Sequence, residues 1–253
     1  MKLLRDTSLI YRRSMKQTLR QPVWVAIGLL QPLMFLFLFG PLLEQVVRAP
    51  GFPQGGAWNV FVPGLLVQIA LFAGVFAGFG LVAQIRTGVL ERFRVTPVSR
   101  TALLFGFALR DTTILVVQAL LLIAIAIPLG LHIDAAGVAI TILLLALVGL
   151  ALGSGSYVIA LATKSEEALA PITNTISMPL LLLSGVLLPM ALAPVWLQTI
   201  ATANPLLHAV DAVRAVFVGH PGDPAVGFGL GLFAVLAAVG LWGAGRMFGR
   251  TVS

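Results

Sequence analysis

The sequence contains no cysteine and few charged residues. Only 10% of its 253 residues are charged, whereas 59% are apolar, and the mean hydropathy is +1.03. A water-soluble domain normally has about a quarter of its residues charged. The composition therefore excludes an ordinary soluble surface and disfavours disorder, collagen-like repeats and nucleic-acid binding. The lack of cysteine excludes disulfides, thiolate metal sites and thiol catalysis. We expect an integral membrane protein.

Six apolar runs are long enough to cross a bilayer, which requires roughly 20 residues per helix. Membrane-spanning strands alternate apolar and polar residues, and these runs do not, so an all-α protein is predicted. The charged stretch before the first run is too long for a signal peptide and no small-residue cleavage site follows it. The predicted spans are Val23–Leu43, Asn59–Ile85, Leu103–Leu129, Gly137–Ala162, Leu169–Leu188 and Val226–Gly245.

The basic residues are distributed unevenly between these runs. If the N-terminus is cytoplasmic, most Lys and Arg fall inside, and only Arg48 and Arg214 fall outside with all three histidines. The positive-inside rule favours this orientation. Six spans then place the C-terminus in the cytoplasm too. The net charge of +7 is interpreted as an orientation signal and not as a polyanion site.

Residues 1–21 predict an amphipathic elbow helix. Such a helix can lie in the membrane interface, with its apolar side in lipid and its basic side toward headgroups. Whether it also touches a cytoplasmic partner stays open. The apolar face is Leu4, Tyr11, Met15 and Leu19, a second face carries Arg13, Lys16 and Arg20, and the candidate site residues are Tyr11, Arg12, Arg13, Lys16 and Arg20.

The loop RTGVLERFRVTPVSR, residues 86–100, is short and dense in charge. Leu90 and Phe93 are three positions apart, which predicts a brief amphipathic helix with Glu91 exposed. Pro97 ends it, because the residue before a proline is pushed away from helical geometry.

Thr96 and Ser99 can cap the helix that follows this loop. A short rigid helix on the cytoplasmic side has the shape needed to pass force between a soluble motor and a membrane domain. A solvated loop that carries orientation charge explains the same residues equally well.

The segment Leu183–Gly219 is too apolar for a free loop and too interrupted by proline for one more span. We expect two short helices, 195–203 and 206–218, joined at Asn204-Pro205. Irregular backbone at membrane depth must be buried in protein or line a wet cavity. A re-entrant outer hairpin over 189–219 is therefore predicted. Its candidate residues are Pro189, Asn204, Pro205, and the i,i+3 pair of Asp211 with Arg214.

Small residues recur at every fourth position in three of the spans, which predicts close helix packing. They are Ala70, Gly74 and Gly78 in the second, Gly149 and Gly153 in the fourth, and Gly227 and Gly231 in the sixth.

Three motifs follow one another in a fixed order: Gly88–Arg92 leading to Val95–Arg100, then Leu183-Ser184-Gly185 followed by Pro189, then Asn204-Pro205-Leu206 with Asp211 and Arg214. With the six spans, they resemble the permease subunits of ABC-2 type transporters, and most closely the daunorubicin-resistance type of drug exporter. The resemblance covers the whole chain as a single ABC-2 transmembrane domain, residues 1–253. Most members carry acidic residues ahead of the glycine, where this chain has Ile85-Arg86-Thr87.

The resemblance implies that two such chains, identical or different, pair in a bacterial cell membrane and bind two copies of a separate ATP-binding-cassette ATPase. ATP and Mg would be held by that ATPase, with no cofactor or metal bound by this chain. The loop 86–101 would be the coupling helix that docks into the ATPase. Its coupling residues would be Leu90, Glu91, Arg92, Phe93, Arg94, Thr96, Pro97 and Arg100.

The sequence itself also indicates that a separate subunit supplies the energy for transport. No GxxxxGK[ST] phosphate loop is present, since the three lysines, Lys2, Lys16 and Lys164, stand in other settings. We expect a permease, not an enzyme, that exports a hydrophobic or amphipathic compound such as a drug, an antibiotic or a lipid.

A substrate path is expected where the resemblance places the seam between two permeases, along the first and fifth spans. Aromatic and thioether side chains there would tolerate cargo of varied shape. Ordinary lipid or helix packing explains each residue equally well. The candidates are Gln31, Phe35, Phe39, Asn174, Ser177 and Met178.

Two other functions are weighed. An ion-coupled transporter needs ionisable groups near the membrane centre, and the middle thirds of the predicted spans have none; Asp111, near a cytoplasmic end, is expected to pair with Arg110 or Arg100. An intramembrane enzyme would need a base beside its hydroxyl nucleophile. Ser154, Ser156 and Tyr157 have none nearby in sequence, so their hydroxyls are expected to bond backbone carbonyls. The histidines, His132, His208 and His220, lack metal-ligand spacing.

Overall fold

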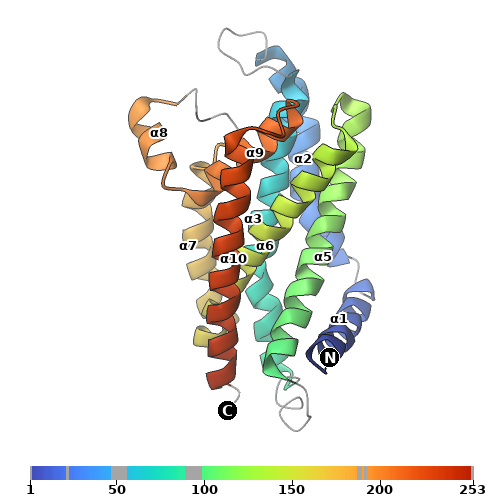
Figure 1. The fold of residues 1–253 in the computed structure, drawn as a ribbon, viewed down its shortest axis with the longest axis vertical. Coiled ribbons are helices and arrows are strands. Elements are labelled where there is room, and N and C mark those ends of the chain that lie inside the picture. The colour runs from blue at the N-terminus through green and yellow to red at the C-terminus, as the bar shows by residue number, and fades with distance from the viewer. Residues whose placement is uncertain are drawn as a thin grey trace.

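The chain folds into a bundle of helices that stand side by side (Figure 1). The computed structural model describes residues 2–20, 23–46, 56–88, 99–186, 190 and 193–251. Within these ranges every regular element is helical, as predicted. The start of α1 and the end of α10 lie at the same end of the bundle, which we call the inner end; the opposite end is the outer end.

Ten helical elements are described. They are α1 (Lys2–Leu19), α2 (Val23–Val46), α3 (Gly56–Arg86), α5 (Arg100–Ala126), the 3-10 turn η1 (Ile127–Leu129), α6 (Ala135–Thr163), α7 (Glu166–Leu182), α8 (Val195–Ala201), α9 (Pro205–Phe217) and α10 (Pro224–Thr251).

Among the described residues, four helices are long and apolar enough to cross a membrane: α3, α5 continued by η1, α6 and α10. They correspond to the predicted second, third, fourth and sixth spans. Part of α2, Val25–Gly40, is a shorter apolar helix. The predicted end of the fifth span is wrong: α7 stops at Leu182, because the chain turns there and Gly185 takes a positive φ of 70°.

Short polar side chains fix where several helices begin. Ser99, Asp134, Ser165 and Asn204 each accept a hydrogen bond from a backbone N–H in the first turn that follows. These bonds satisfy donors that a helix leaves unpaired at its start. The predicted cap at Ser99 is confirmed.

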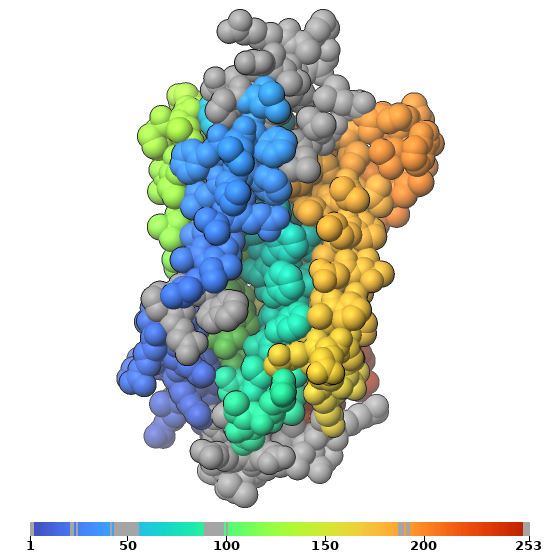
Figure 2. Space-filling model, turned by 180° about the vertical axis from the view of Figure 1, so that it is seen from behind, coloured from blue at the N-terminus to red at the C-terminus, as the bar shows by residue number. Residues whose placement is uncertain are grey.

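α3 is the central helix, and α2, α5, α6, α7 and α9 all pack on it. From the opposite side, α3 is seen between α2 and α7 (Figure 2). It runs in the same direction as α6, since contacts advance together along both: Gly74 meets Gly149 and Gly153, and Gly78 meets Ser156. A Cβ on Gly74 would lie 2.6 Å from the Cβ of Leu152.

The predicted close packing is thus confirmed for the second and fourth spans. It is wrong for the sixth. Gly227 and Gly231 on α10 have no neighbouring atom within 4 Å of where a Cβ would lie. Their spacing is the same, but their side of the helix faces outward.

Both short helices of the predicted outer hairpin are present, although α8 ends at Ala201 and not at residue 203. α9 is buried against α3, α6 and α10 at the outer end, whereas α8 projects from the side of the bundle (Figure 1). Val195, Trp196 and Ile200 of α8 are exposed.

Candidate functional site

The predicted coupling loop joins α3 to α5 at the inner end. α3 ends at Arg86, and Gly88, with a φ of 68°, donates its N–H to the Ile85 carbonyl at 3.0 Å. α5 begins at Arg100 directly after the Ser99 cap. The other predicted coupling residues, Leu90, Glu91, Arg92, Phe93, Arg94, Thr96 and Pro97, lie outside the described residues, as does Pro189 of the outer hairpin.

An ion pair connects the end of α3 to the start of α7. The Nη1 atom of Arg86 lies 3.7 Å from Oε1 of Glu166, and both side chains are largely exposed. Such a pair contributes little to stability, but it places the inner ends of two helices side by side.

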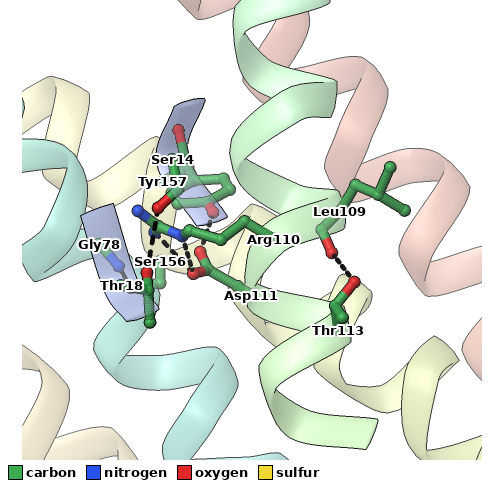
Figure 3. A network of polar contacts seen from close by, with 9 residues as sticks. All are labelled: Ser14, Thr18, Gly78, Leu109, Arg110, Asp111, Thr113, Ser156 and Tyr157. Atoms are coloured by element: carbon green, nitrogen blue, oxygen red, sulfur yellow. Dashed lines mark hydrogen bonds and ion pairs between the residues drawn. The ribbon is translucent and has the colours of Figure 1, made fainter. Parts of the chain in front are cut away.

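A buried polar network lies deeper in the bundle, between α5 and α6 (Figure 3). Arg110 donates from Nε to Oδ1 of Asp111 at 2.7 Å, and its Nη2 forms an ion pair with the same oxygen at 2.6 Å. The Tyr157 hydroxyl donates to the other oxygen, Oδ2. Both carboxylate oxygens are therefore occupied, and the predicted pairing of Asp111 with Arg110 is confirmed.

The surroundings of Arg110 explain how a cation is held there. Its side chain is 13% exposed and that of Asp111 is 20% exposed. The guanidinium carbon lies 5.6 Å from the centre of the Phe107 ring, a cation–π distance. On α3, Gly80 faces Nη2, and a Cβ there would lie 3.3 Å away. The pair is thus enclosed by α3, α5 and α6.

Sequence reasoning missed Tyr157 as the third member of this network. A lone carboxylate in an apolar helix needs partners from neighbouring helices. A tyrosine in another span could therefore have been predicted as a partner of Asp111. The small space around it is lined by Gly74, Thr112 and Ser154 and leaves about 10 Å³, on the order of one water molecule. It has no room for a cargo molecule.

α1 is fixed to α5 one turn before the network. A Cβ on Gly106 would lie 2.6 Å from Cγ2 of Ile10, so the two helices touch closely. Ile10 and Ser14 are buried in this contact. Tyr11 and Met15 are half-buried, whereas Leu4 and Leu19 are exposed. The helix therefore has a packing side that the predicted apolar face did not include.

Ser154 and Ser156 of α6 bond backbone carbonyls as predicted, whereas the prediction is wrong for Tyr157, whose hydroxyl bonds the Asp111 side chain. Ser156 donates to the Val75 carbonyl at 2.5 Å and accepts the N–H of Gly78 at 3.0 Å, and Ser154 donates to Ala151 at 2.9 Å. The two bonds of Ser156 hold α6 against α3, and the bond of Ser154 stays within α6. Within the described ranges, no group of three His, Asp or Glu could hold a metal ion.

The predicted substrate-path residues are only partly brought together. Phe35 and Phe39 of α2 pack edge to face, with ring centres 5.5 Å apart. Asn174 and Met178 are exposed on α7, but Ser177 is buried and donates to the Thr173 carbonyl at 2.6 Å. Gln31 on α2 is exposed.

A second aromatic group, which the sequence analysis did not single out, lies on α3. The ring centres of Phe72 and Phe76 are 5.8 Å apart, and those of Phe76 and Phe79 are 5.7 Å apart. Their spacing along one helix face was visible in the sequence.

At the outer end, the hairpin is tied to the bundle through backbone carbonyls. Arg214 donates from Nε to Val60 at 3.0 Å and from Nη2 to Gly185 at 2.6 Å. Its Nη1 lies 4.0 Å from Oδ1 of Asp211, so the predicted pair forms, but loosely. Burial lowers the pKa of Arg214 to about 10, and Asp211 opposes that shift, so Arg214 stays charged at neutral pH.

Two asparagines complete the outer end. Asn204 caps α9 ahead of Pro205 and also donates to the Leu180 carbonyl at 2.8 Å, which ties the hairpin to α7. Asn59 donates to the carbonyls of Phe217 at 2.9 Å and His132 at 3.2 Å. The sequence motifs pointed to Asn204 but not to Asn59.

Comparison with known proteins agrees with this architecture. The model of the ABC-2 type transporter family matches residues 5–218. The chain belongs to the ABC-2 type transporter family. The match of the ABC-2 model runs from α1 through the predicted coupling loop to the end of the predicted outer hairpin. This region holds all three motifs on which the resemblance rested.

Individual relatives of this ABC-2 permease are distant but cover most of its length. A transport permease named ycf38 from Cyanophora paradoxa is 26% identical over 216 residues, which is 85% of this chain and 74% of the relative. Its counterpart from Porphyra purpurea is 27% identical over 220 residues, 85% and 75%. The daunorubicin resistance ABC transporter permease protein DrrB1 from Streptomyces coeruleorubidus is 29% identical over 229 residues, 86% and 77%. The predicted resemblance is confirmed, and the chain is a membrane transport permease of the ABC type.

Proposed function

We propose that this chain is the membrane subunit of an ATP-driven exporter in a bacterial cell membrane. Its six spans are α2, α3, α5, α6, α7 and α10, and the inner end faces the cytoplasm. Two such chains and two copies of a separate ATPase, which binds ATP and Mg, form the transporter. The cargo is hydrophobic or amphipathic: a drug, an antibiotic or a lipid. Family membership and the name of the DrrB1 relative support this assignment.

The sidedness of the charges carries the proposed orientation. Arg86, Lys164 and Arg246 stand at the inner ends of α3, α6 and α10, beside the basic α1. Arg246 also lies 4.1 Å from the ring centre of Trp242. Tryptophan and arginine at such a level are typical of a membrane interface, and an excess of basic residues marks the cytoplasmic side.

The helix packing at the inner end would transmit a movement of the coupling loop to the rest of the bundle. α5 starts where the loop ends, touches α1 through Gly106 and is joined to α6 by Asp111 and Tyr157. An ATPase that displaced the loop would therefore move α1, α5 and α6 together. Such rigid-body motion switches a transporter between inward-open and outward-open states.

The test of ATPase coupling is Glu91→Lys in the chain co-expressed with an ATP-binding-cassette ATPase subunit. We expect normal membrane insertion but loss of ATPase capture and of export. Glu167→Lys, at an exposed acid of the same inner end, is the matched control and should export normally. Wild-type export by the Glu91 variant, or ATP hydrolysis by the purified chain alone, would contradict the proposal.

The substrate path is tested by Phe35→Ala/Phe39→Ala. If these rings contact cargo, resistance to exported compounds changes while the ATPase still assembles with the permease. Unchanged resistance would assign the pair to packing alone.

One observation favours a second candidate, an ion-coupled transporter: a carboxylate, Asp111, lies inside the bundle. Its two oxygens are occupied by Arg110 and Tyr157, which leaves no oxygen without a partner for a coupling ion. Proteoliposomes that contain the chain without an ATPase decide between the two. Cargo movement driven by a proton or sodium gradient would replace the exporter assignment.

A further inference from the structure

One glutamine of the central helix is buried without a hydrogen bond. Gln68 of α3 is fully buried, and neither its Nε2 nor its Oε1 atom has a hydrogen-bond partner. Burial removes water from an amide, and without a protein partner this loss is not offset. The amide of Gln68 therefore destabilises the arrangement of helices in which it is found.

The other buried amide side chains in the described part of the chain are all bonded. Asn59, Gln118 and Asn204 each donate to a backbone carbonyl of another helix. Gln118 of α5, for example, donates from Nε2 to the Val25 carbonyl of α2 at 3.0 Å. Gln68 is the exception, and a buried group left unpaired favours any other arrangement in which it finds a partner.

Gln68 lies where one face of α3 changes from covered to open. Gly64, Gln68, Phe72 and Phe76 follow at every fourth position and therefore share this face. At the outer end the turn after α7 covers the face, since a Cβ on Gly64 would lie 3.0 Å from the Cα of Val186. Toward the inner end Phe76 is 48% exposed, and α3 is seen between α2 and α7 (Figure 2). Gln68 is thus at the edge of the cover that α7 and its turn provide.

α7 runs antiparallel to α3, and two contacts fix the register of the pair. An ion pair joins the end of α3 to the start of α7, and Gly64 of α3 meets Val186 just after α7. Because both helices rise by the same length per residue, Gln68 is level with the last turn of α7, residues 179–182. That turn begins with Pro179, whose missing N–H removes one helix hydrogen bond and permits a bend.

The buried side of α7 is mostly polar. Its buried residues are Leu169, Thr173 and Ser177. The two hydroxyls donate to carbonyls of α7 itself, those of Leu169 at 2.9 Å and Thr173 at 2.6 Å, so neither donates across to α3. Ser156 of α6, by contrast, makes two bonds to α3. α7 is therefore held against α3 more weakly than α6 is.

The outer end of α7 is fixed, whereas its inner part is held weakly. Hydrogen bonds from the outer hairpin hold the carbonyls of Leu180 and Gly185. At the inner end, the ion pair at the start of α7 is largely exposed and contributes little. A bend at Pro179 would therefore swing the inner part of α7 away from α3 and open the contact beside Gln68.

We propose that the contact between α3 and α7 opens by a bend at Pro179, and that the water which enters binds the amide of Gln68. Water both donates and accepts hydrogen bonds, so it pairs the two atoms that lack a partner in the closed contact. Gln68 therefore shifts the chain toward the open arrangement. The proposal depends neither on an ATPase partner nor on a cargo.

The first test uses the two buried glutamines as a matched pair, in the full-length chain in nanodiscs. Gln68→Met replaces the unpaired amide by an apolar side chain of similar length and should raise the thermal midpoint by about 2–4 °C. Gln118→Met removes an amide that is bonded and should lower the midpoint. An unchanged or lower midpoint in Gln68→Met would overturn the proposal, because the amide would then not destabilise the closed contact.

The second test asks where water enters. The chain lacks cysteine, so Ser177→Cys places a single thiol on the buried side of α7, and Ser154→Cys places one at a buried position of α6. Both serines are buried and donate to a carbonyl of their own helix, which makes them a matched pair. A charged, water-soluble methanethiosulfonate should modify the thiol of Ser177→Cys much faster than that of Ser154→Cys.

Adding Gln68→Met to these two reporters separates the role of the amide from the opening itself. It should slow the modification of Ser177→Cys by about tenfold, since opening then no longer rescues an unpaired amide, and leave Ser154→Cys unchanged. Equally slow modification of both thiols would show that the contact stays closed to water. An unchanged rate at Ser177→Cys would show that Gln68 does not favour opening. Either result would overturn the proposal, and the comparison of the two thiols needs no variant of Gln68 to fold.

Discussion

The two ends of the bundle bury an arginine in different ways. At the outer end, Arg214 donates to the backbone carbonyls of Val60 and Gly185. At the inner end, Arg110 donates to the side chain of Asp111, which is held in turn by Tyr157. A backbone carbonyl cannot turn away unless the chain moves, whereas a side-chain partner can change rotamer.

The difference indicates a division of labour. The outer bonds join three separate segments, α3, the turn after α7, and α9, through atoms that have fixed positions. The inner bonds join α5 to α6 through side chains alone. We expect the outer end to act as a rigid scaffold and the inner end to set how α5 lies against α6.

The largest effect is expected from Asp111→Ala, which leaves Arg110 buried without its counter-charge. Breaking a buried pair in this way costs about 3–5 kcal/mol. The free energy of unfolding, measured by SDS titration in mixed micelles, should fall by that amount. Arg110→Met/Asp111→Leu should recover most of it, because a buried pair can be replaced as a unit by apolar residues. If the double variant is as unstable as Asp111→Ala, the inner pair cannot be replaced as a unit. The contrast between exchangeable side-chain partners at the inner end and fixed backbone partners at the outer end would then be wrong.

The next effect is expected from Arg214→Met at the outer end. It removes two hydrogen bonds from a charged donor to backbone carbonyls, at about 1.5–3 kcal/mol each, so we expect a loss of about 3 kcal/mol in the same assay. Arg214→Lys should recover only part, since one amine does not reproduce two separated donors. Asp211→Asn is the control: its side chain is 48% exposed and lies 4.0 Å away, so its loss should cost less than about 1 kcal/mol.

A smaller effect is expected from Tyr157→Phe, which removes one hydrogen bond to a charged group. The free energy of unfolding should fall by about 1.5–3 kcal/mol. Ser154→Ala removes a bond within one helix and should change it by less. Equal losses in both variants would mean that the link between α5 and α6 contributes nothing beyond a local hydroxyl bond.

The smallest effect is expected at Gly231, which takes part in neither the Arg214 bonds nor the Arg110 network. A variant there serves as the reference for a substitution that breaks no contact. Gly231→Ala meets open space and should leave the thermal midpoint unchanged or raise the stability by about 0.5–1 kcal/mol, since alanine favours a helix. Gly74→Ala should lower the midpoint, because a Cβ there would lie 3.1 Å from the backbone nitrogen of Gly153. A loss at Gly231 would reveal a contact on the outward side of α10.

Much of the fold was predictable because long apolar runs and polar caps are local features. Ser99 could be identified as a cap, and Asn204-Pro205 as the junction of two short helices, from their neighbours alone. The end of α7 could not, because the chain stays apolar through Leu183 while Gly185 turns it. Hydropathy records the environment of a segment and not its backbone direction.

The site was less predictable because it depends on helices that are distant in sequence. Arg110 and Asp111 are adjacent, so their pairing followed from proximity. Tyr157 is 46 positions from Asp111 and reaches it only because α6 packs beside α5. The α5 contact of Ile10 likewise depends on the missing side chain of Gly106, which no pattern within α1 could reveal.

The shared direction of α3 and α6 has an electrostatic consequence at the inner end. Peptide dipoles of two parallel helices in contact add, so their carbonyl ends place two partial negative charges close together. Arg86 lies in the last turn of α3, and Lys164, with a φ of 52°, follows the last residue of α6. These two cations therefore oppose the macrodipoles of the central helix pair, in addition to the part we propose for them in orienting the chain.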